Sequence, residues 1–267
     1  MDKNFLRTFK VILEYDGTAY HGWQWQSEKR SLQAEFERAL FEVTRQKIRV
    51  YSSGRTDAGV HAFGQVLHFR AETRLSLEVF QKAINVHLPS DVNVLHLEEA
   101  SDDFHALLNA KRKTYYYFIF NARSPELFLK RYSWQVYRPL DWKKMKEALK
   151  CLKGKHDFKS FQSVGTEVKT TVRTLFKTQI LKSGSSSLKI PQKPSWSWIQ
   201  HPNLHVIVLE GDGFLKQMVR NIVGTLVEVG YGRISVAEFK KILAAKDRKK
   251  AGPAAPAKGL FLVNVKY

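Results

Sequence analysis

Apolar residues recur along the chain at two spacings, one typical of strands and the other typical of helices. Alternation at every second position predicts a strand over residues 9–15, which the turn residues Asp16 and Gly17 close. Strand-forming residues also dominate the segments 48–53, 64–72, 113–121, 172–182, 204–210 and 259–267. We therefore expect strands along the whole length of the chain.

Between these strands, apolar residues at three- and four-residue spacing predict amphipathic helices within 31–46, 77–87, 140–154 and 211–230, and a further helix from residue 235. Ser31 is typical of an N-cap, and Ser235 with Glu238 has the spacing of a capping box. Gly154 is the expected C-cap of the third helix. The fourth helix is expected to bury a face made of Phe214, Met218, Val219, Ile222, Val223 and Leu226.

The order of these segments favours an α+β fold in two halves, 1–105 and 106–267, with antiparallel or mixed sheets. A parallel dinucleotide-binding core is therefore not expected. The Ser- and Pro-rich segment 183–203 predicts a long exposed loop in the second half. No internal repeat is strong enough to indicate duplication.

The charge of the chain indicates a polyanionic partner. Lys and Arg number 44 and Asp and Glu number 25, so the formal net charge is +19. Such a field attracts phosphates, which favours nucleic acid, with acidic membrane surfaces as the alternative. Since neither a bilayer-spanning run nor a cleavable leader is recognisable, we expect a cytoplasmic protein without membrane association. The single cysteine, Cys151, argues against an internal disulfide and a Cys-rich zinc site.

The segment Ser53–His61, with the sequence SGRTDAGVH, is the strongest candidate for chemistry. Gly54 and Gly59 permit a tight backbone and the close approach of a ligand, and they bracket Arg55 and Asp57. A nearby guanidinium keeps a carboxylate ionised, and an ionised carboxylate serves as nucleophile or general base. A structural turn with a surface ion pair is the alternative, which these residues taken alone favour.

Other common chemistries find little support in the sequence. The phosphate-loop, dinucleotide-binding and serine-nucleophile motifs do not occur. The histidines do not form ligand-spaced pairs, and their surroundings indicate structural roles for His61, His68, His96 and His105. We therefore expect no metal site.

An aromatic strand and an arginine in an apolar helix segment are two further candidates. Alternation places Tyr115 and Tyr117 on one face of the strand and Tyr116 on the other, so one face can stack on a base. Packing in the core is the favoured alternative for most of these rings. Arg220 lies among apolar residues, where a buried cation needs a partner such as Asp57. Exposure of Arg220 on the outer helix face is the alternative.

Eight segments of the chain follow one another in an order typical of a single family. They are LEYDGTAYHGWQWQ, SLQAEFERAL, GRTDAGVH, DDFHA, KTYYYFIFN, HDFKSF, MVRNIVGTLVEVG and AAPAKGLFLVNVKY. On these segments the chain resembles the tRNA pseudouridine synthase A family over nearly its whole length. The resemblance implies a pseudouridine synthase fold, in which two RNA-recognition-like (ferredoxin-like) halves meet at a basic cleft. It also implies a homodimer in which one tRNA touches both subunits.

Residue by residue, the resemblance implies a site as well. It places the catalytic aspartate at Asp57, the arginine of the GRTD motif at Arg55, and the tyrosine that stacks near the target base at Tyr115. It makes Arg220 the partner of the catalytic carboxylate and places Leu260 near the floor of the pocket. The implied reaction isomerises uridine to pseudouridine at positions 38–40 of the anticodon stem-loop of tRNA, without metal or organic cofactor.

Two departures from the family pattern leave questions open. Leu107 stands where the family has an arginine, so a basic RNA contact is missing or is replaced by Lys111 or Arg112. The segment 183–203 is longer than usual, and its role is open, as is the choice between attack on the base and a glycal route. An RNA-binding module in which Asp57 is dispensable is a competing function. A metal-dependent nuclease is a weaker one, because it needs clustered carboxylates.

Overall fold

The computed structural model describes residues 6–165, 168–185, 188 and 200–267. The chain forms two compact units: unit 1 comprises Met1–Lys111 and Leu262–Tyr267, and unit 2 comprises Arg112–Phe261. Both units combine helices with largely antiparallel strands, so the predicted α+β class is confirmed. The expected boundary between residues 105 and 106 lies near the first passage of the chain from unit 1 to unit 2.

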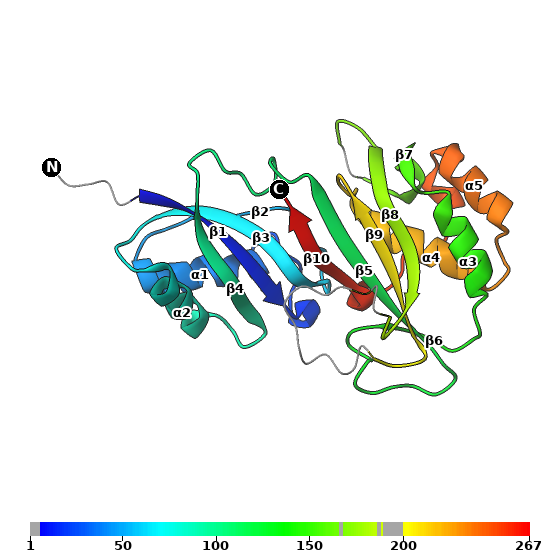
Figure 1. Ribbon diagram of the computed structural model, residues 1–267, viewed down its shortest axis with the longest axis horizontal. Coiled ribbons are helices and arrows are strands. Elements are labelled where there is room, and N and C mark those ends of the chain that lie inside the picture. The colour runs from blue at the N-terminus through cyan, green and yellow to red at the C-terminus, as the bar shows by residue number, and fades with distance from the viewer. Residues whose placement is uncertain (1–5, 166–167, 186–187, 189–199) are drawn as a thin grey trace. The chain divides into compact units, whose positions relative to one another are not determined.

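Unit 1 is an antiparallel sheet accompanied by two helices (Figure 1). Its elements are β1 (Leu6–Tyr15), α1 (Leu32–Thr44), β2 (Tyr51–Ser52), β3 (His61–Glu72), α2 (Leu77–His87), β4 (Val92–Ala100) and most of β10 (Leu260–Lys266). The strand order is β4-β1-β3-β10, and β2 pairs with β3. Helices α1 and α2 contact each other and lie on one face of the sheet.

The core of unit 1 is aromatic. The ring of Phe9 lies 5.4 Å from that of Phe69 and 5.1 Å from that of Phe80, measured between centroids. Phe36, on α1, lies 6.1 Å from Phe69. All four rings are buried, each contributing about 1.5–3 kcal/mol to the free energy of unfolding. The apolar faces predicted from helical and strand spacing thus meet in one core.

The described residues of unit 2 form a mixed sheet accompanied by three helices. Its elements are β5 (Arg112–Asn121), β6 (Trp134–Val136), α3 (Trp142–Lys150), β7 (Gly154–Asp157), β8 (Val172–Lys182), β9 (Leu204–Gly211), α4 (Met218–Gly230) and α5 (Val236–Ala245). The strand order is β5-β9-β8-β7 with antiparallel pairs, whereas β6 pairs with β5 in parallel. Helix α3 contacts α4, α5 and β8.

Two helix starts predicted from the sequence are confirmed. The Ser31 hydroxyl accepts a hydrogen bond from the backbone N–H of Ala34 at the start of α1. At the start of α5, Ser235 and Glu238 each accept from the backbone N–H of the other, which completes the capping box. Capping satisfies N–H groups that a helix leaves without internal partners, so these residues determine where the helices begin.

Two expectations about helix ends are wrong. Gly154 is not the C-cap of α3, because the N–H of Cys151 already bonds to the Ala148 carbonyl and ends the helix. Gly154 instead begins β7 with a φ of +106°, which favours glycine. Phe214 lies outside α4, since Gln217 precedes the helix in the left-handed conformation. The rest of the predicted face is buried: Met218, Val219, Ile222, Val223 and Leu226.

The strand predictions differ in accuracy along the chain. Strand β8 has the predicted bounds, whereas only Tyr51–Ser52 of the predicted strand 48–53 pairs with β3. Strand β4 was not predicted, and its register against β1 shifts between Ile12 and Leu13. Of the predicted loop 183–203, residues 186–187 and 189–199 lie outside the described residues. No helix in the described part of the chain is long and apolar enough to cross a membrane.

Candidate active site

The loop 54–60, between β2 and β3, carries Asp57 and is anchored through Thr56. The backbone N–H of Trp23 donates to the Thr56 carbonyl over 3.0 Å. The buried Thr56 hydroxyl lies 2.8 Å from the hydroxyl of Tyr15 at the end of β1. Burial raises the pKa of Tyr15 well above its usual range, so the phenol stays neutral and keeps its proton for hydrogen bonding. The position next to Asp57 is therefore fixed by both backbone and side chain.

Two glycines allow the segment 17–23 to approach this loop backbone to backbone. A Cβ on Gly22 would lie 2.6 Å from the Thr56 carbonyl oxygen, and Gly22 has a φ of +95°. A Cβ on Gly17 would lie only 2.0 Å from the Val60 carbonyl oxygen. Neither contact tolerates a side chain, so glycine is required at both positions.

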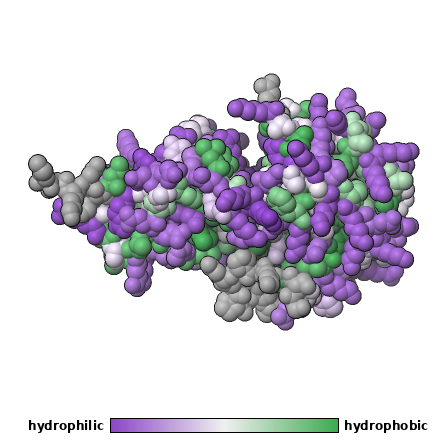
Figure 2. All heavy atoms as spheres, turned by 45° about the horizontal axis from the view of Figure 1, so that its top comes forward, coloured by the Kyte–Doolittle hydropathy of each residue, from purple (hydrophilic) through white to green (hydrophobic). Residues whose placement is uncertain are grey.

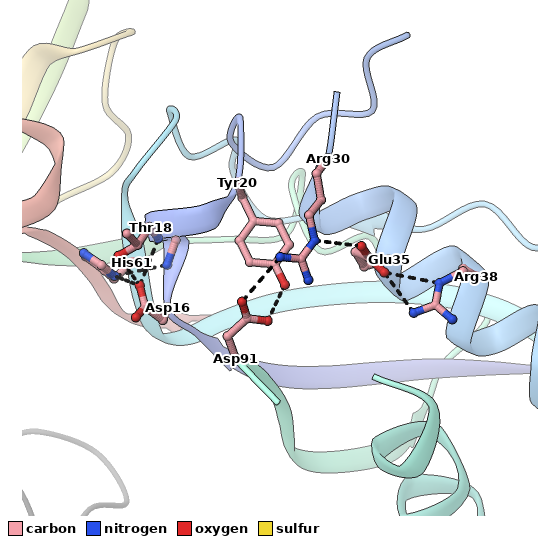
Figure 3. A network of polar contacts seen from close by, with 9 residues as sticks. Asp16, Thr18, Tyr20, Arg30, Glu35, Arg38, His61 and Asp91 are labelled. Carbon is pink, nitrogen blue, oxygen red and sulfur yellow. Dashed lines mark hydrogen bonds and ion pairs between the residues drawn. The ribbon is translucent and has the colours of Figure 1, made fainter. Parts of the chain in front are cut away.

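A polar network connects the segment 17–23 to other parts of unit 1 (Figure 3). The Tyr20 hydroxyl donates to Asp91, and the other Asp91 oxygen lies 3.7 Å from Arg30 Nη1. The Arg30 guanidinium also lies over the Tyr20 ring, 4.4 Å from its centroid, and its Nε donates to Glu35 over 2.9 Å. Burial and the Asp91 carboxylate raise the pKa of Tyr20 well above its usual range. The network thereby ties the segment to α1 and to the residue before β4.

A second cluster in Figure 3 fixes the exit of the loop into β3. Asp16 Oδ1 accepts hydrogen bonds from the backbone N–H and hydroxyl of Thr18, and it lies 3.1 Å from His61 Nδ1. Burial alone would raise the pKa of Asp16, but His61 and the Thr18 hydrogen bonds outweigh it and hold this pKa below its usual range. Asp16 therefore stays ionised beside the first residue of β3.

The side chains of Asp57 and Arg55 differ in exposure: Asp57 is half-buried and Arg55 is exposed. The backbone N–H of Val60 donates to the Asp57 carbonyl over 3.1 Å, which closes a turn around Asp57. A partly shielded carboxylate on a fixed backbone can serve as nucleophile or general base. The predicted action of Arg55 on Asp57 stays a prediction.

In unit 2, Tyr115 is buried on β5, opposite Leu209 of β9. The ring of Phe214 meets it edge-on, with centroids 4.9 Å apart and an interplanar angle of 78°. Phe214, which the sequence placed on a helix face, is thus a loop residue that orients the Tyr115 ring. The predicted stacking of Tyr115 near a target base stays a prediction.

Arg220 occupies the first turn of α4 and is half-buried. Its Nε donates to the Ala255 carbonyl over 2.8 Å, and the Ala255 N–H donates to the Arg220 carbonyl over 3.0 Å. Gly224, one turn further, permits this contact, because a Cβ there would lie 1.7 Å from the Pro253 carbonyl oxygen. The sequence indicates a partner for the guanidinium but gives no sign that a carbonyl from a distant loop accepts from it. Pairing with Asp57 stays a prediction.

Leu260 is buried at the start of β10, directly after a short 3-10 helix, Ala257–Gly259. The Tyr117 hydroxyl donates to the Pro256 carbonyl over 2.7 Å, and a Cβ on Gly259 would lie 2.7 Å from the Tyr117 ring. Burial raises the pKa of Tyr117, which the nearby Arg220 partly offsets. Unit 2 therefore gathers Tyr117, Arg220 and the segment before Leu260.

The supporting residues of the loop escaped the sequence reasoning. Tyr15 belongs to the predicted strand 9–15, and periodicity predicts no role for Gly22 or Trp23. Their signal is the segment DGTAYHGW, in which two glycines alternate with aromatic residues outside any regular period. Such a mixture indicates close backbone packing, but it does not identify the partner segment.

Among residues that the structure describes, no group of three or more His, Cys, Asp and Glu is placed to hold a metal ion. Figure 2 shows hydrophilic side chains over most of the face in view, with hydrophobic residues scattered among them. The net charge of +19, which belongs to the chain as a whole, favours a polyanionic partner.

Comparisons with known proteins agree with these features. A family model described as tRNA pseudouridine synthase matches residues 11–109 and 148–267. The chain is 44% identical over 260 residues to tRNA pseudouridine synthase A of Geobacillus kaustophilus (strain HTA426), covering 97% of this chain and 93% of that protein. It is 41% identical over 262 residues to tRNA pseudouridine synthase A of Geobacillus sp. (strain WCH70), covering 98% of each.

A solved structure, "Crystal Structure of a Cbf5-Nop10-Gar1 Complex", is matched with a TM-score of 0.31 and 12% identity. The match covers 82% of this chain and 54% of that chain, so this chain spans about half its length. The family match includes the loop with Asp57, as well as Arg220 and Leu260, whereas Tyr115 lies between the two matched segments.

Proposed function

The chain belongs to the tRNA pseudouridine synthase family, and we propose that it isomerises uridines at positions 38–40 of the anticodon stem-loop of tRNA, with Asp57 as nucleophile. The anchoring of the loop 54–60 carries the proposal for Asp57. Thr56 is fixed by Tyr15 and Trp23, so the next side chain projects from a backbone with little freedom. A nucleophile gains rate from such a fixed position, because little orientation is left to lose in the transition state.

The reaction moves the glycosidic bond from N1 to C5 of the same base. The Asp57 carboxylate attacks either the base or the sugar C1′, and the N1–C1′ bond breaks with its electron pair on the uracil. The ring turns and a C5–C1′ bond forms. The bond to Asp57 breaks with its electron pair returning to the carboxylate, either when C5 displaces it from C1′ or when it is eliminated from the base. The C5 proton leaves and N1 gains a proton. Because substrate and product contain the same atoms at the same oxidation level, the reaction needs no oxidant or reductant, and we expect no metal or organic cofactor.

The remaining site residues have supporting roles in this proposal. A stem uridine must leave the helix stack before Asp57 can reach it, at about a few kcal/mol. Tyr115 stacks on the flipped or detached uracil and Leu260 contributes an apolar floor to the pocket. Arg220 and Arg55 stabilise the ionised form of Asp57.

The proposal extends to the whole tRNA and to the assembly of the chain. A net charge of +19 gives phosphate contacts a large share of the affinity, so affinity falls steeply with salt. We propose a homodimer in which one tRNA contacts both subunits, acting in the cytoplasm, where tRNA is processed. These properties follow from the family resemblance and the charge.

Tritium release tests the chemistry. When C5 bonds to C1′, the hydrogen on C5 is lost, so tRNA labelled with tritium at uridine C5 releases label into water. We expect release by the wild-type protein and none by Asp57→Ala. Absence of release from either protein with tRNA binding intact would favour an RNA-binding module. Strand cleavage that a chelator abolishes, without release of tritium, would favour a nuclease.

The position of the modified uridines is tested separately. After treatment of the product tRNA with a carbodiimide that marks pseudouridine, primer extension is expected to stop at positions 38–40. Stops elsewhere, with tritium still released, would reject the anticodon arm as target while leaving the role of Asp57 intact.

A further inference from the structure

A pocket of about 530 Å³ opens in unit 1, and none of its lining residues belongs to the candidate active site. The volume is within the range of sites that hold small organic groups. Its walls come from the chain between α1 and β2, from β3, and from the turn after β4. All of these segments belong to unit 1.

One wall of the pocket is a group of stacked aromatic rings. The ring of Tyr51 stacks on His68, with centroids 5.2 Å apart and planes at 25°, and His105 lies 4.6 Å from His68. The ring of Phe104 meets His68 edge-on at 5.9 Å. Tyr51 is 48% exposed, so part of its ring is open to a further stacking partner. Proteins bind unpaired nucleotides by stacking bases on such rings.

Backbone hydrogen bonds orient both histidines in this wall. His68 Nδ1 accepts a hydrogen bond from the Ala106 N–H over 3.2 Å, and His105 Nδ1 accepts from the Leu107 N–H over 3.2 Å. Burial, followed by the proximity of His105 and of Arg70, lowers the pKa of His68. Burial therefore favours the neutral form of His68, on which the Tyr51 ring stacks.

Positively charged side chains line the pocket together with this aromatic wall. Lys47, Arg49 and Arg70 line the pocket and are exposed, against the carboxylates of Asp102 and Asp103. Arg70 is occupied in part, since its Nη2 donates to the Asp102 carbonyl. Within the described part of the chain, Lys47 and Arg49 form no ion pair. Two unengaged cations beside an aromatic wall suit a base together with its phosphate.

The pocket is preformed by contacts that do not depend on a ligand. The Gln46 side chain donates to the Glu72 carbonyl over 2.7 Å and accepts from the Glu72 N–H over 3.0 Å. Five residues on, Tyr51 pairs with His68 in the β2–β3 ladder. The chain that carries Lys47 and Arg49 is thus held along β3 at both ends.

We propose that this pocket binds one nucleotide of the substrate RNA other than the target uridine, with its base stacked on Tyr51 and its phosphate held by Lys47 and Arg49. The proposal rests on the proposed function, because it takes tRNA as the substrate. Tyr51 and Asp57 are six residues apart in the sequence, so at most about 22 Å of extended chain separates them. One RNA strand can therefore reach both positions.

Steady-state tritium release with increasing concentrations of labelled tRNA tests the pocket. We expect Tyr51→Ala to raise KM roughly tenfold with kcat unchanged, because stacking contributes to binding and not to the chemical step. Tyr51→Phe keeps the ring and is expected to keep the wild-type KM. Tyr137→Ala, which removes a similarly exposed tyrosine from unit 2, is the matched control and is expected to change neither constant.

A second variant tests the contact of Lys47 and Arg49 with the phosphate. Lys47→Gln combined with Arg49→Gln is expected to raise KM and to make the fall of log affinity with log salt less steep by about 0.7 to 0.9, the slope of one lost phosphate contact. Lys82→Gln, an exposed lysine on α2 outside the pocket, is expected to change the slope by less than half of that.

An unchanged KM in Tyr51→Ala would overturn the pocket and leave the proposed function standing. A lower kcat at unchanged KM would also overturn it, since β2 would then only support the loop 54–60. Ultraviolet cross-linking of the protein to tRNA, followed by peptide mapping, tests the contact between Tyr51 and the RNA without requiring turnover. An adduct on Tyr51 supports the pocket and adducts only elsewhere overturn it, whereas failure of the proposed function is seen as no tritium release from the wild type.

Discussion

Unit 1 carries Asp57 on an irregular loop, whereas unit 2 carries Tyr115 on a strand and Arg220 on a helix. The loop keeps its geometry through backbone contacts at Gly22 and one buried hydroxyl pair, so a single methyl group can displace it while the sheet stays intact. A strand or helix residue moves only when its element moves. Substitutions beside the loop should therefore affect activity more than stability, and substitutions beside α4 should affect stability more than activity.

The largest effect on stability is expected in unit 2 from Gly224→Ala. The added Cβ would lie 1.7 Å from the Pro253 carbonyl oxygen, so α4 and the segment with Ala255 must separate. We expect the free energy of unfolding to fall by about 3 kcal/mol, together with loss of the Arg220–Ala255 hydrogen bonds. Urea unfolding followed by circular dichroism measures it. A fall below about 1 kcal/mol would contradict the close contact.

Among substitutions that leave the site residues themselves unchanged, the largest effect on activity is expected in unit 1 from Gly22→Ala. The new Cβ would meet the Thr56 carbonyl oxygen at 2.6 Å and shift the loop that carries Asp57. Misplacement of a catalytic group by about 1 Å costs on the order of 100-fold in kcat, which we expect here.

Gly232→Ala is the matched control for this loop substitution. Gly232 has a φ of +75°, comparable with the +95° of Gly22, but a Cβ there meets nothing within 4 Å. Both variants therefore carry a similar backbone strain of about 1–2 kcal/mol, and only Gly22→Ala moves the loop. Equal kcat values in Gly22→Ala and Gly232→Ala would contradict the inference that a methyl group beside the loop 54–60 reduces activity by displacing Asp57.

Sequence reasoning predicts the regular elements of both units well, because each is encoded by its own residues. The starts of α1 and α5 follow from Ser31 and Ser235, and the bounds of β8 follow from its composition. Strand β4 escapes because its pairing with β1 includes a register shift between Ile12 and Leu13, which breaks the simple alternation.

The candidate site is predicted less completely, since its geometry depends on contacts between distant segments. The motif around Asp57 is visible in the sequence, but the packing of Gly22 on Thr56 is not. Likewise, the sequence shows that Arg220 needs a partner, whereas the Ala255 carbonyl is 35 residues away and has no side-chain signature. Backbone acceptors carry no sequence signal, so motif reasoning cannot identify them.

A smaller effect is expected from the pH dependence of stability, and it arises in unit 2. His205 stacks on the Trp142 indole, with centroids 3.7 Å apart and planes at 10°, and burial lowers its pKa to about 4. The unfolded chain binds this proton near pH 6.5, whereas the folded chain does so only near pH 4. The free energy of unfolding should therefore fall as the pH drops through this window.

Between pH 7 and pH 5 the contribution of His205 amounts to about 2 kcal/mol. Urea unfolding gives the free energy of unfolding at pH 7 and at pH 5. The difference between these two free energies should be smaller in His205→Gln than in the wild type by about 2 kcal/mol. An unchanged pH dependence in this variant would show that His205 titrates normally in the folded protein.

The central claim is that Asp57 performs the chemistry while the basic surface provides the affinity. Its most direct test measures turnover and tRNA affinity side by side for Asp57→Asn, which keeps the shape of the side chain and removes its charge. We expect no tritium release above background, with the dissociation constant within roughly tenfold of wild type, or ~1.4 kcal/mol. Residual turnover near the wild-type rate, or a much larger loss of affinity, would contradict the account.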